Sequence, residues 1–340
     1  MTAVSGVGPW PGADVLDAQQ VVVGDLVDTP DEVDGVPFAV LLPARGPWGD
    51  ATGAALALLE EMPAELGPHG WKLADHPGVD LGRARAFARE DRDALAVAAH
   101  GYDGPLVLPV LGPFSLAAQV YLARGDRVLS DPGAVRAVVG SLAEGLVQRI
   151  GDVVRAVPGA RVRVLLHEPL LAPVMAGAVP SFSGRDRLRR VHGPVVADGL
   201  SAVADAARGA GATGLDVHGG SAWSALTAVR ASTADGAALE IAGIGERGWE
   251  EVATLVEAGK GFAAQLPPQA TSQCAGPDVV GQADALTRPW RTVGLPLRDL
   301  AAVTLLAAAP PDGAGPDEAR AALAGLVRAA GIVAERAADA

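Results

Sequence analysis

Polar side chains suited to acid–base or metal chemistry stand at the ends of several apolar runs in this 340-residue sequence. His167 and Glu168 end one such run, and His218 ends the next, two residues after Asp216. Glu240 lies within the apolar run ALEIAGI, where an unpaired carboxylate would be costly. Imidazole and carboxylate groups can hold a divalent metal or act as a general acid and base. The sequence therefore predicts a site built from His167, Glu168, His218 and Glu240.

These residues also have ordinary structural interpretations. His167 could cap a strand and bond a backbone carbonyl, and Asp216 or His218 could be a satisfied polar group at the rim of a sheet. The pair Gly219-Gly220 could provide a tight turn, or could let a ligand approach the backbone. Glu240 is the residue that a purely structural interpretation explains least well.

Eight short apolar runs would position these side chains. Nearly continuous apolar runs are typical of parallel strands that are covered on both faces. The expected strands are residues 4–9, 38–42, 106–111, 162–167, 213–218, 238–242, 261–266 and 303–307. Amphipathic stretches separate them, and the clearest of these predicts a helix over 132–157 with Asp131 as its N-cap. Further helices are expected over 249–258 and from 316 to the C-terminus.

This alternation of strands and helices predicts an α/β fold, a single (β/α)8 TIM barrel that covers residues 1–340. An open, doubly wound sheet is the alternative. Barrel enzymes carry their chemistry at the C-terminal ends of the strands and in the loops that follow. Three of these connections are long, at about 10–37, 43–105 and 168–212, so we expect functional side chains at that rim.

Composition narrows the classes of partner. The net charge of −13 would repel phosphate backbones, so no nucleic-acid partner is expected. No apolar run reaches the roughly 18 to 20 residues of a membrane helix, so no membrane partner is expected either. Cys274 is the only cysteine, which excludes an internal disulfide and is typical of a cytoplasmic protein. A small-molecule substrate remains, and the sequence does not indicate an oligomeric state.

Four segments together resemble a known enzyme family. They are SGVGPWPG at 5–12, GPFSLA at 112–117, LLHEPLL at 165–171 and DVHGG at 216–220. In this order and spacing they resemble the C-terminal catalytic barrel of cobalamin-independent methionine synthase, particularly its short, single-barrel, actinobacterial-type members. The resemblance covers nearly the whole chain. It implies a TIM barrel that transfers a methyl group from 5-methyltetrahydrofolate, or another methyl donor, to the thiol of homocysteine.

The resemblance also implies a zinc ion, which lowers the pKa of the bound thiol. His218 matches the histidine ligand of the family and Glu240 matches the glutamate ligand. Gly220 and Ala307 stand where the family has its two cysteine ligands, so the metal set is incomplete in this chain. Cys274 is a candidate for a substitute ligand.

The resemblance also places the amino-acid and folate pockets of the family at particular residues of this chain. A folate would lie near Phe114, Ser115 and Glu168. His167 stands where the family has an aspartate that binds the substrate amino group. The steps Gly8-Pro9 and Gly46-Pro47 also depart from the family pattern.

Three functions remain open from the sequence. The first is a divergent methyltransferase of the methionine synthase type. The second is a metal-free enzyme of the uroporphyrinogen decarboxylase-like superfamily, in which His167, Glu168, His218 and Glu240 act as acid–base groups. The third is a non-catalytic binding homologue that kept the barrel and lost the chemistry.

Overall fold

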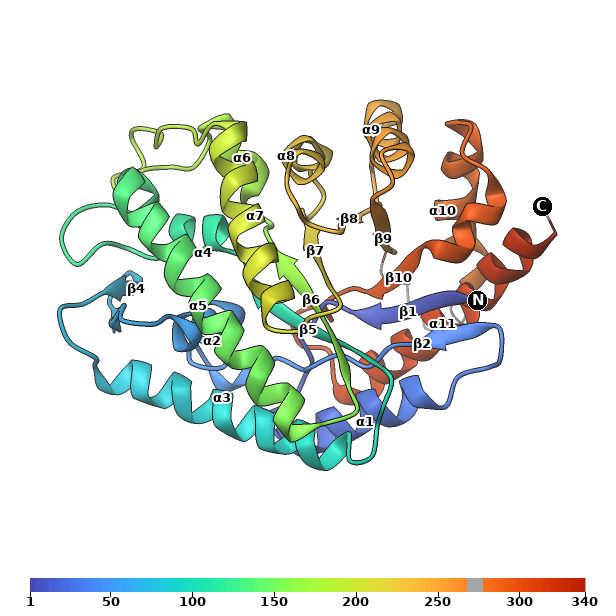
Figure 1. The fold of residues 1–340 in the computed structure, drawn as a ribbon, viewed down its shortest axis with the longest axis horizontal. Helices are drawn as coiled ribbons and strands as arrows, with labels where there is room; N and C mark the ends of the chain where they lie inside the picture. The colour runs from blue at the N-terminus through green and yellow to red at the C-terminus, as the bar shows by residue number, and fades with distance from the viewer. Residues whose placement is uncertain (268–277, 340) are drawn as a thin grey trace.

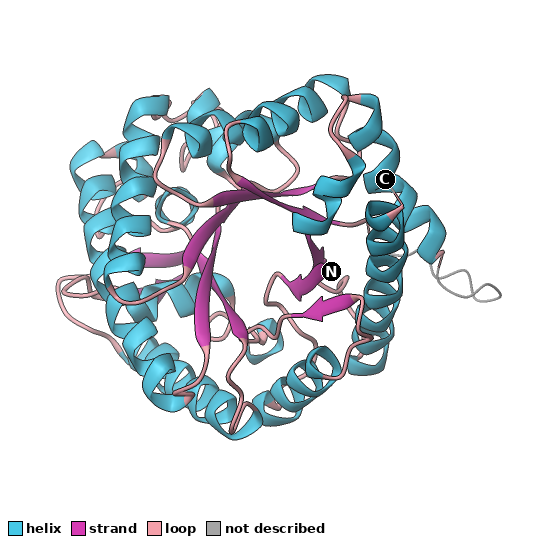
Figure 2. Ribbon diagram, turned by 45° about the vertical axis from the view of Figure 1, so that its right-hand side comes forward, coloured by secondary structure: helices cyan, strands magenta, loops and turns pink. Residues whose placement is uncertain are grey.

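A computed structural model describes residues 1–267 and 278–339, and its main sheet has eight parallel strands that curl around a central axis (Figure 2). In spatial order the strands are β2 (Val33–Gly35), β1 (Thr2–Gly6), β10 (Thr304–Ala307), β9 (Gly261–Gln265), β8 (Gly236–Glu240), β7 (Gly214–His218), β6 (Arg161–His167) and β5 (Pro105–Leu111). Seven of the eight runs expected from the sequence overlap a strand of this sheet.

The segment that follows β2 closes the sheet into a barrel. Phe38 pairs with Val107 of β5 in a parallel bridge. The N–H of Ala39 donates to the carbonyl of Val107 at 2.9 Å, and the N–H of Val107 donates to the carbonyl of Pro37 at 2.8 Å. The strand expected at 38–42 is therefore an irregular continuation of β2, because Pro37 has no N–H to give to a regular ladder. The fold is a single (β/α)8 barrel.

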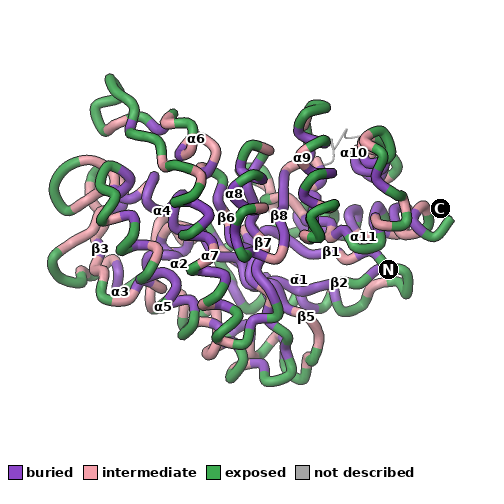
Figure 3. Tube along the Cα trace, turned by 45° about the horizontal axis from the view of Figure 1, so that its top comes forward, coloured by how far each residue is buried: buried purple, intermediate pink, exposed green. Residues whose placement is uncertain are grey.

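A ring of helices covers the outer face of the sheet (Figures 1 and 2). They are α1 (Val15–Val27), α2 (Ala51–Leu58), α3 (Val79–Ala98), α5 (Pro132–Ala156), α7 (Gly193–Gly209), α8 (Leu226–Ala231), α9 (Glu246–Glu257), α10 (Val279–Thr292) and α11 (Pro316–Ala338). The predicted N-cap of α5 is confirmed, since the Asp131 carboxylate accepts hydrogen bonds from the N–H groups of Gly133 and Ala134. Buried segments line the space between helices and strands, and exposed segments lie outside (Figure 3).

The connections that follow the strands carry additional structure at the carboxyl ends of the barrel. The segment 43–105 contains an antiparallel hairpin, β3 (Ala64–Gly67) and β4 (Gly70–Leu73), which the sequence analysis did not predict. Tyr121 joins this hairpin, because its N–H donates to the carbonyl of Trp71 at 2.9 Å. Two short helices, α4 (Pro113–Gln119) and α6 (Leu171–Ala176), directly follow β5 and β6.

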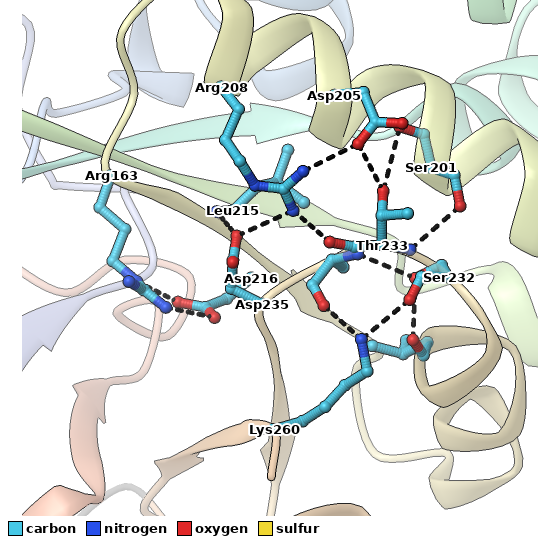
Figure 4. Close-up of polar contacts among 12 residues, drawn as sticks. Arg163, Ser201, Asp205, Arg208, Leu215, Asp216, Ser232, Thr233, Asp235 and Lys260 are labelled. Atoms are coloured by element: carbon cyan, nitrogen blue, oxygen red, sulfur yellow. Dashed lines mark hydrogen bonds and ion pairs between the residues drawn. The ribbon is translucent and has the colours of Figure 1, made fainter. Parts of the chain in front are cut away.

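A network of charged side chains ties together the opposite, amino-terminal ends of β7 to β9 (Figure 4). The Asp235 carboxylate accepts the N–H of Leu215 at 2.8 Å and pairs with Arg208 at 3.4 Å. Lys260 Nζ donates to the carbonyls of Ser232 at 2.8 Å and Ala234 at 2.6 Å. In TIM barrels this end serves stability and the other end serves chemistry.

Replacing Lys260 with methionine is expected to lower the free energy of unfolding by about 1–3 kcal/mol, because two carbonyls lose a charged donor. Urea denaturation followed by circular dichroism measures the change. Lys72 is the matched control, since its ion pair with Glu65 lies at the surface, and Lys72→Met should cost less than about 1 kcal/mol. Equal losses in the free energy of unfolding at Lys260 and Lys72 would show that the charged network does not stabilise the fold.

Candidate functional site at the carboxyl ends of β6 to β9

The structure brings the predicted site residues to neighbouring strand ends. His167 ends β6, His218 ends β7 and Glu240 ends β8. His167 is the register partner of His218, and Glu240 is the partner of Gln265 at the end of β9. Ala238, two residues before Glu240, is the partner of His218. Register partners in parallel strands face the same side and side chains repeat every two residues, so these side chains share one face of the sheet.

The two imidazoles lie against each other, with ring centroids 5.0 Å apart and planes inclined by 53°. Burial lowers the pKa of His167 to about 3, the neighbouring His218 adds to the effect, and the Val7 backbone opposes it. Burial also lowers the pKa of His218 to about 4, against smaller opposing effects from hydrogen bonding to the Gln265 side chain and to the backbone of His218 itself. Both rings are therefore uncharged at neutral pH.

The tautomer of His218 follows from its backbone contact. The N–H of Gly220 donates to Nδ1 of His218 at 3.4 Å. A neutral ring that accepts at Nδ1 carries its proton on Nε2. Nε2 of His218 and Nε2 of His167 are both buried, and neither forms a hydrogen bond of good geometry with the residues that the structure describes. A buried donor without an acceptor is costly, so His218 Nε2–H is suited to an oxygen atom of a ligand.

Glu168 is fully buried and its carboxylate is already occupied. One oxygen accepts the N–H of Phe114 at 2.9 Å, and the other accepts the N–H and the hydroxyl of Ser115, each at 2.7 Å. A Cβ at Gly112 would lie 2.3 Å from this carboxylate, so only glycine fits there. Glu168 thus fixes the start of α4, and the Phe114 and Ser115 side chains beside it are fully buried.

Burial raises the pKa of Glu168 to about 7, while the hydrogen bonds from Ser115 and Phe114 oppose that rise. Because the unfolded pKa lies near 4.5, the folded chain retains a proton that the unfolded chain releases. The bound proton makes its full contribution to the free energy of unfolding below about pH 4.5. This contribution is lost as the pH rises towards 7. The loss should total about 3 kcal/mol.

Glu168→Gln is therefore expected to be more stable relative to wild type at pH 8 than at pH 5, because glutamine cannot ionise. Urea denaturation at both pH values measures the difference. Glu65→Gln, at a partly exposed carboxylate, is the control. A constant gap between Glu168→Gln and wild type would contradict the assigned pKa.

The described residues do not fit the zinc site that the resemblance implies. Structural and catalytic zinc sites use three or four protein ligands, and residues 1–267 and 278–339 hold no group of three His, Cys, Asp or Glu side chains placed for a metal ion. Gly220 has a φ of +65°, which a cysteine would adopt only with strain. Cys274 lies outside the described residues.

Ser5 was quoted in the sequence analysis only as part of a motif, and the structure adds it to the site. It is fully buried, and its Oγ has no hydrogen-bond partner within residues 1–267 and 278–339. Ser5 is the register partner of Leu306, which is the partner of Gln265, so Ser5 faces the same side as the Gln265 carboxamide. The signal in the sequence was a serine hydroxyl in the middle of a short, mostly apolar strand.

Asp216 proves to be a satisfied polar group. It lies one layer below His218 on the same strand and forms a bidentate ion pair with Arg163, at 2.5 and 2.8 Å. Figure 4 shows the two side chains meeting. This pair lies on the amino-terminal side of the imidazoles.

No family model matches the chain, and no curated protein matches it significantly. Solved structures match with low sequence identity. A GH113 β-1,4-mannanase is 10% identical with a TM-score of 0.43, over 90% of this chain and 87% of its own. A putative sugar phosphate isomerase/epimerase from Anabaena variabilis is 12% identical with a TM-score of 0.35, over 71% of this chain and 82% of its own.

The carboxyl transferase domain of Rhizobium etli pyruvate carboxylase is 11% identical with a TM-score of 0.28, over 94% of this chain and 59% of its own. At these TM-scores and identities, the matches support no conclusion about the activity of this chain. In the described residues, no helix is long and apolar enough to cross a membrane.

Proposed function

We propose that the chain is a metal-independent acid–base enzyme that acts on a small molecule at the carboxyl ends of β6 to β9. One observation carries the proposal: two adjacent neutral imidazoles, His167 and His218, each hold a buried Nε2 that has no hydrogen-bond partner among the residues that the structure describes. Nε2–H of His218 would donate to an oxygen of the substrate, such as a carbonyl. A neutral imidazole can polarise a carbonyl in this way.

Each nearby group has a distinct role in this proposal. Glu240, a partly exposed carboxylate on the same face, would remove a proton from the carbon next to the carbonyl. His218 would stabilise the charge that then develops on the oxygen. His167 would contact the same ligand through its own Nε2. Glu168 would act only as a positioning residue for the start of α4. A cytoplasmic location belongs to the proposal, since the sole cysteine is Cys274.

Exchange of carbon-bound protons with deuterium oxide tests this function. The probes are small 2-oxo acids and hydroxyketones, and NMR follows the loss of the proton signal. We expect wild type to exchange at least one probe, and His218→Phe and Glu240→Gln to lose at least about 100-fold in rate. His69→Phe, at an exposed position, should keep the wild-type rate. Absence of exchange with every probe, or equal rates in all variants, would refute the proposal.

Thiol methyl transfer of the cobalamin-independent methionine synthase type is the second candidate. It is supported by the contact between two segments of the resemblance, because Glu168 of LLHEPLL binds the backbone of GPFSLA. Metal analysis of purified protein, together with methylation of homocysteine by 5-methyltetrahydrofolate, tests it. Stoichiometric zinc with turnover would establish this reaction, and absence of both would end it. Ligand binding without turnover in either assay would identify a non-catalytic barrel.

A further inference from the structure

A basic hairpin projects from the carboxyl-end rim between α6 and α7. We call residues 179–190 the arginine hairpin; in Figure 1 it lies in the yellow-green loop at the upper left. Pro180 and Arg187 form an antiparallel bridge, and the N–H of Leu188 donates to the carbonyl of Val179 at 2.8 Å. Val179 and Leu188 are buried, so the hairpin is anchored to the barrel.

The arginine hairpin presents charge and an aromatic ring to solvent. Arg185, Arg189 and Arg190 are exposed and form no ion pair within the described residues. Phe182 is 54% exposed, and its ring makes an edge contact with His69, with centroids 5.0 Å apart. Arginine and aromatic residues are enriched at protein interfaces. The hairpin also projects outward, whereas small molecules bind in concave sites.

A surface of opposite charge lies at the other end of the barrel. We call residues 27–34 the acidic loop; they comprise the last residue of α1, the connection after it and the start of β2. The acidic loop therefore lies at the amino end of a strand, whereas the arginine hairpin follows the carboxyl end of β6. Its acidic side chains are exposed and form no ion pair in the part of the chain that the structure describes: Asp28, Asp31, Glu32 and Asp34. Val27, beside them, is 55% exposed.

We propose that copies of this chain associate head to tail, with the arginine hairpin of one copy on the acidic loop of the next. Each surface has one exposed large apolar side chain, Phe182 or Val27. The arginine hairpin is basic overall, with four arginines against Asp186, and the acidic loop has four acidic residues and no basic one. The net charge of −13 makes most other contacts between copies repulsive. Because the two surfaces are different, the interface is heterologous and generates a ring or an open chain.

Sedimentation velocity tests this association. We expect the weight-average sedimentation coefficient of wild type to rise with concentration in about 50 mM salt, and the rise to vanish in about 0.5 M salt, where charges are screened within a few ångströms. The hairpin variant carries Arg185→Glu, Arg189→Glu and Arg190→Glu. The loop variant carries Asp28→Arg, Asp31→Arg and Glu32→Arg. Each variant should be monomeric alone, because its hairpin and its loop then carry charges of the same sign. An equimolar mixture should associate again, because the hairpin of each variant is opposite in charge to the loop of the other.

A charge-matched control with Arg136→Glu, Arg247→Glu and Arg328→Glu changes exposed arginines elsewhere and should associate like wild type. Circular dichroism verifies that every variant is folded. The proposal is overturned if wild type stays monomeric in low salt, if the control loses association as the hairpin variant does, or if the two folded variants do not associate when mixed. A folded hairpin variant that still self-associates would also overturn it.

Discussion

A double substitution, His167→Gln with His218→Gln, is expected to remove most of the destabilisation of this barrel by acid. The folded pKa values of the two imidazoles, about 3 and about 4, lie below the unfolded value of about 6.5. Between these values the unfolded chain binds up to two more protons at these positions than the folded chain does. Their contribution to stability is therefore complete above about pH 6.5 and is lost as the pH falls, by roughly 2–3 kcal/mol per pH unit near pH 5.

Urea denaturation at half-unit intervals from pH 7 to pH 4.5 measures this effect. The informative quantity is the gap between wild type and the double variant, because Glu168 titrates in both and its contribution, which has the opposite sign, cancels. Substituting the exposed His69 and His192 with glutamine provides the control, which should follow wild type. If the gap stays constant across this range, the two rings are not held in their neutral form by burial.

Gly145→Ala is expected to destabilise the fold by more than about 3 kcal/mol. Gly145 lies in the middle of α5, and a Cβ there would stand 1.7 Å from the carbonyl oxygen of Leu58, at the end of α2. A backbone atom cannot yield as a flexible side chain can, so the two helices would have to separate. Overpacking of this kind costs about 1–3 kcal/mol even where only side chains must move.

Gly140→Ala, in the same helix, is the matched control. A Cβ at Gly140 meets nothing within 4 Å, so alanine should stabilise α5 by about 0.5–1 kcal/mol. Thermal and urea denaturation of both variants give the comparison. Similar changes in stability at the two positions would contradict the close approach of α5 to α2.

Much of the fold could be predicted from the sequence, because parallel strands buried on both faces appear as apolar runs. The helix with Asp131 at its N-terminus was also predictable, because its N-cap residue and the spacing of its apolar residues can be recognised within the segment itself. The irregular backbone of segment 36–41 was not predictable. Pro37 interrupts the hydrogen-bond ladder, and the barrel is closed there by tertiary contacts with β5. The β3–β4 hairpin was missed because its pattern is short.

The candidate site was predictable only in part. Strand-end positions identified His167, His218 and Glu240, and register puts them on one face. The sequence could not show that the Glu168 carboxylate is occupied by Phe114 and Ser115, because these contacts join residues more than 50 positions apart. The protonation states of the imidazoles depend on burial, which the sequence does not reveal.

Side-chain ¹⁵N NMR of His218 is the most direct test of the proposed site. At pH 6 the account predicts a neutral ring with its proton on Nε2, and a change in the Nε2–H signal when an oxygen-bearing ligand binds. The protonated imidazolium at pH 6, or a neutral ring with its proton on Nδ1, would contradict it, because His218 could not then be the neutral donor on which the proposed chemistry depends.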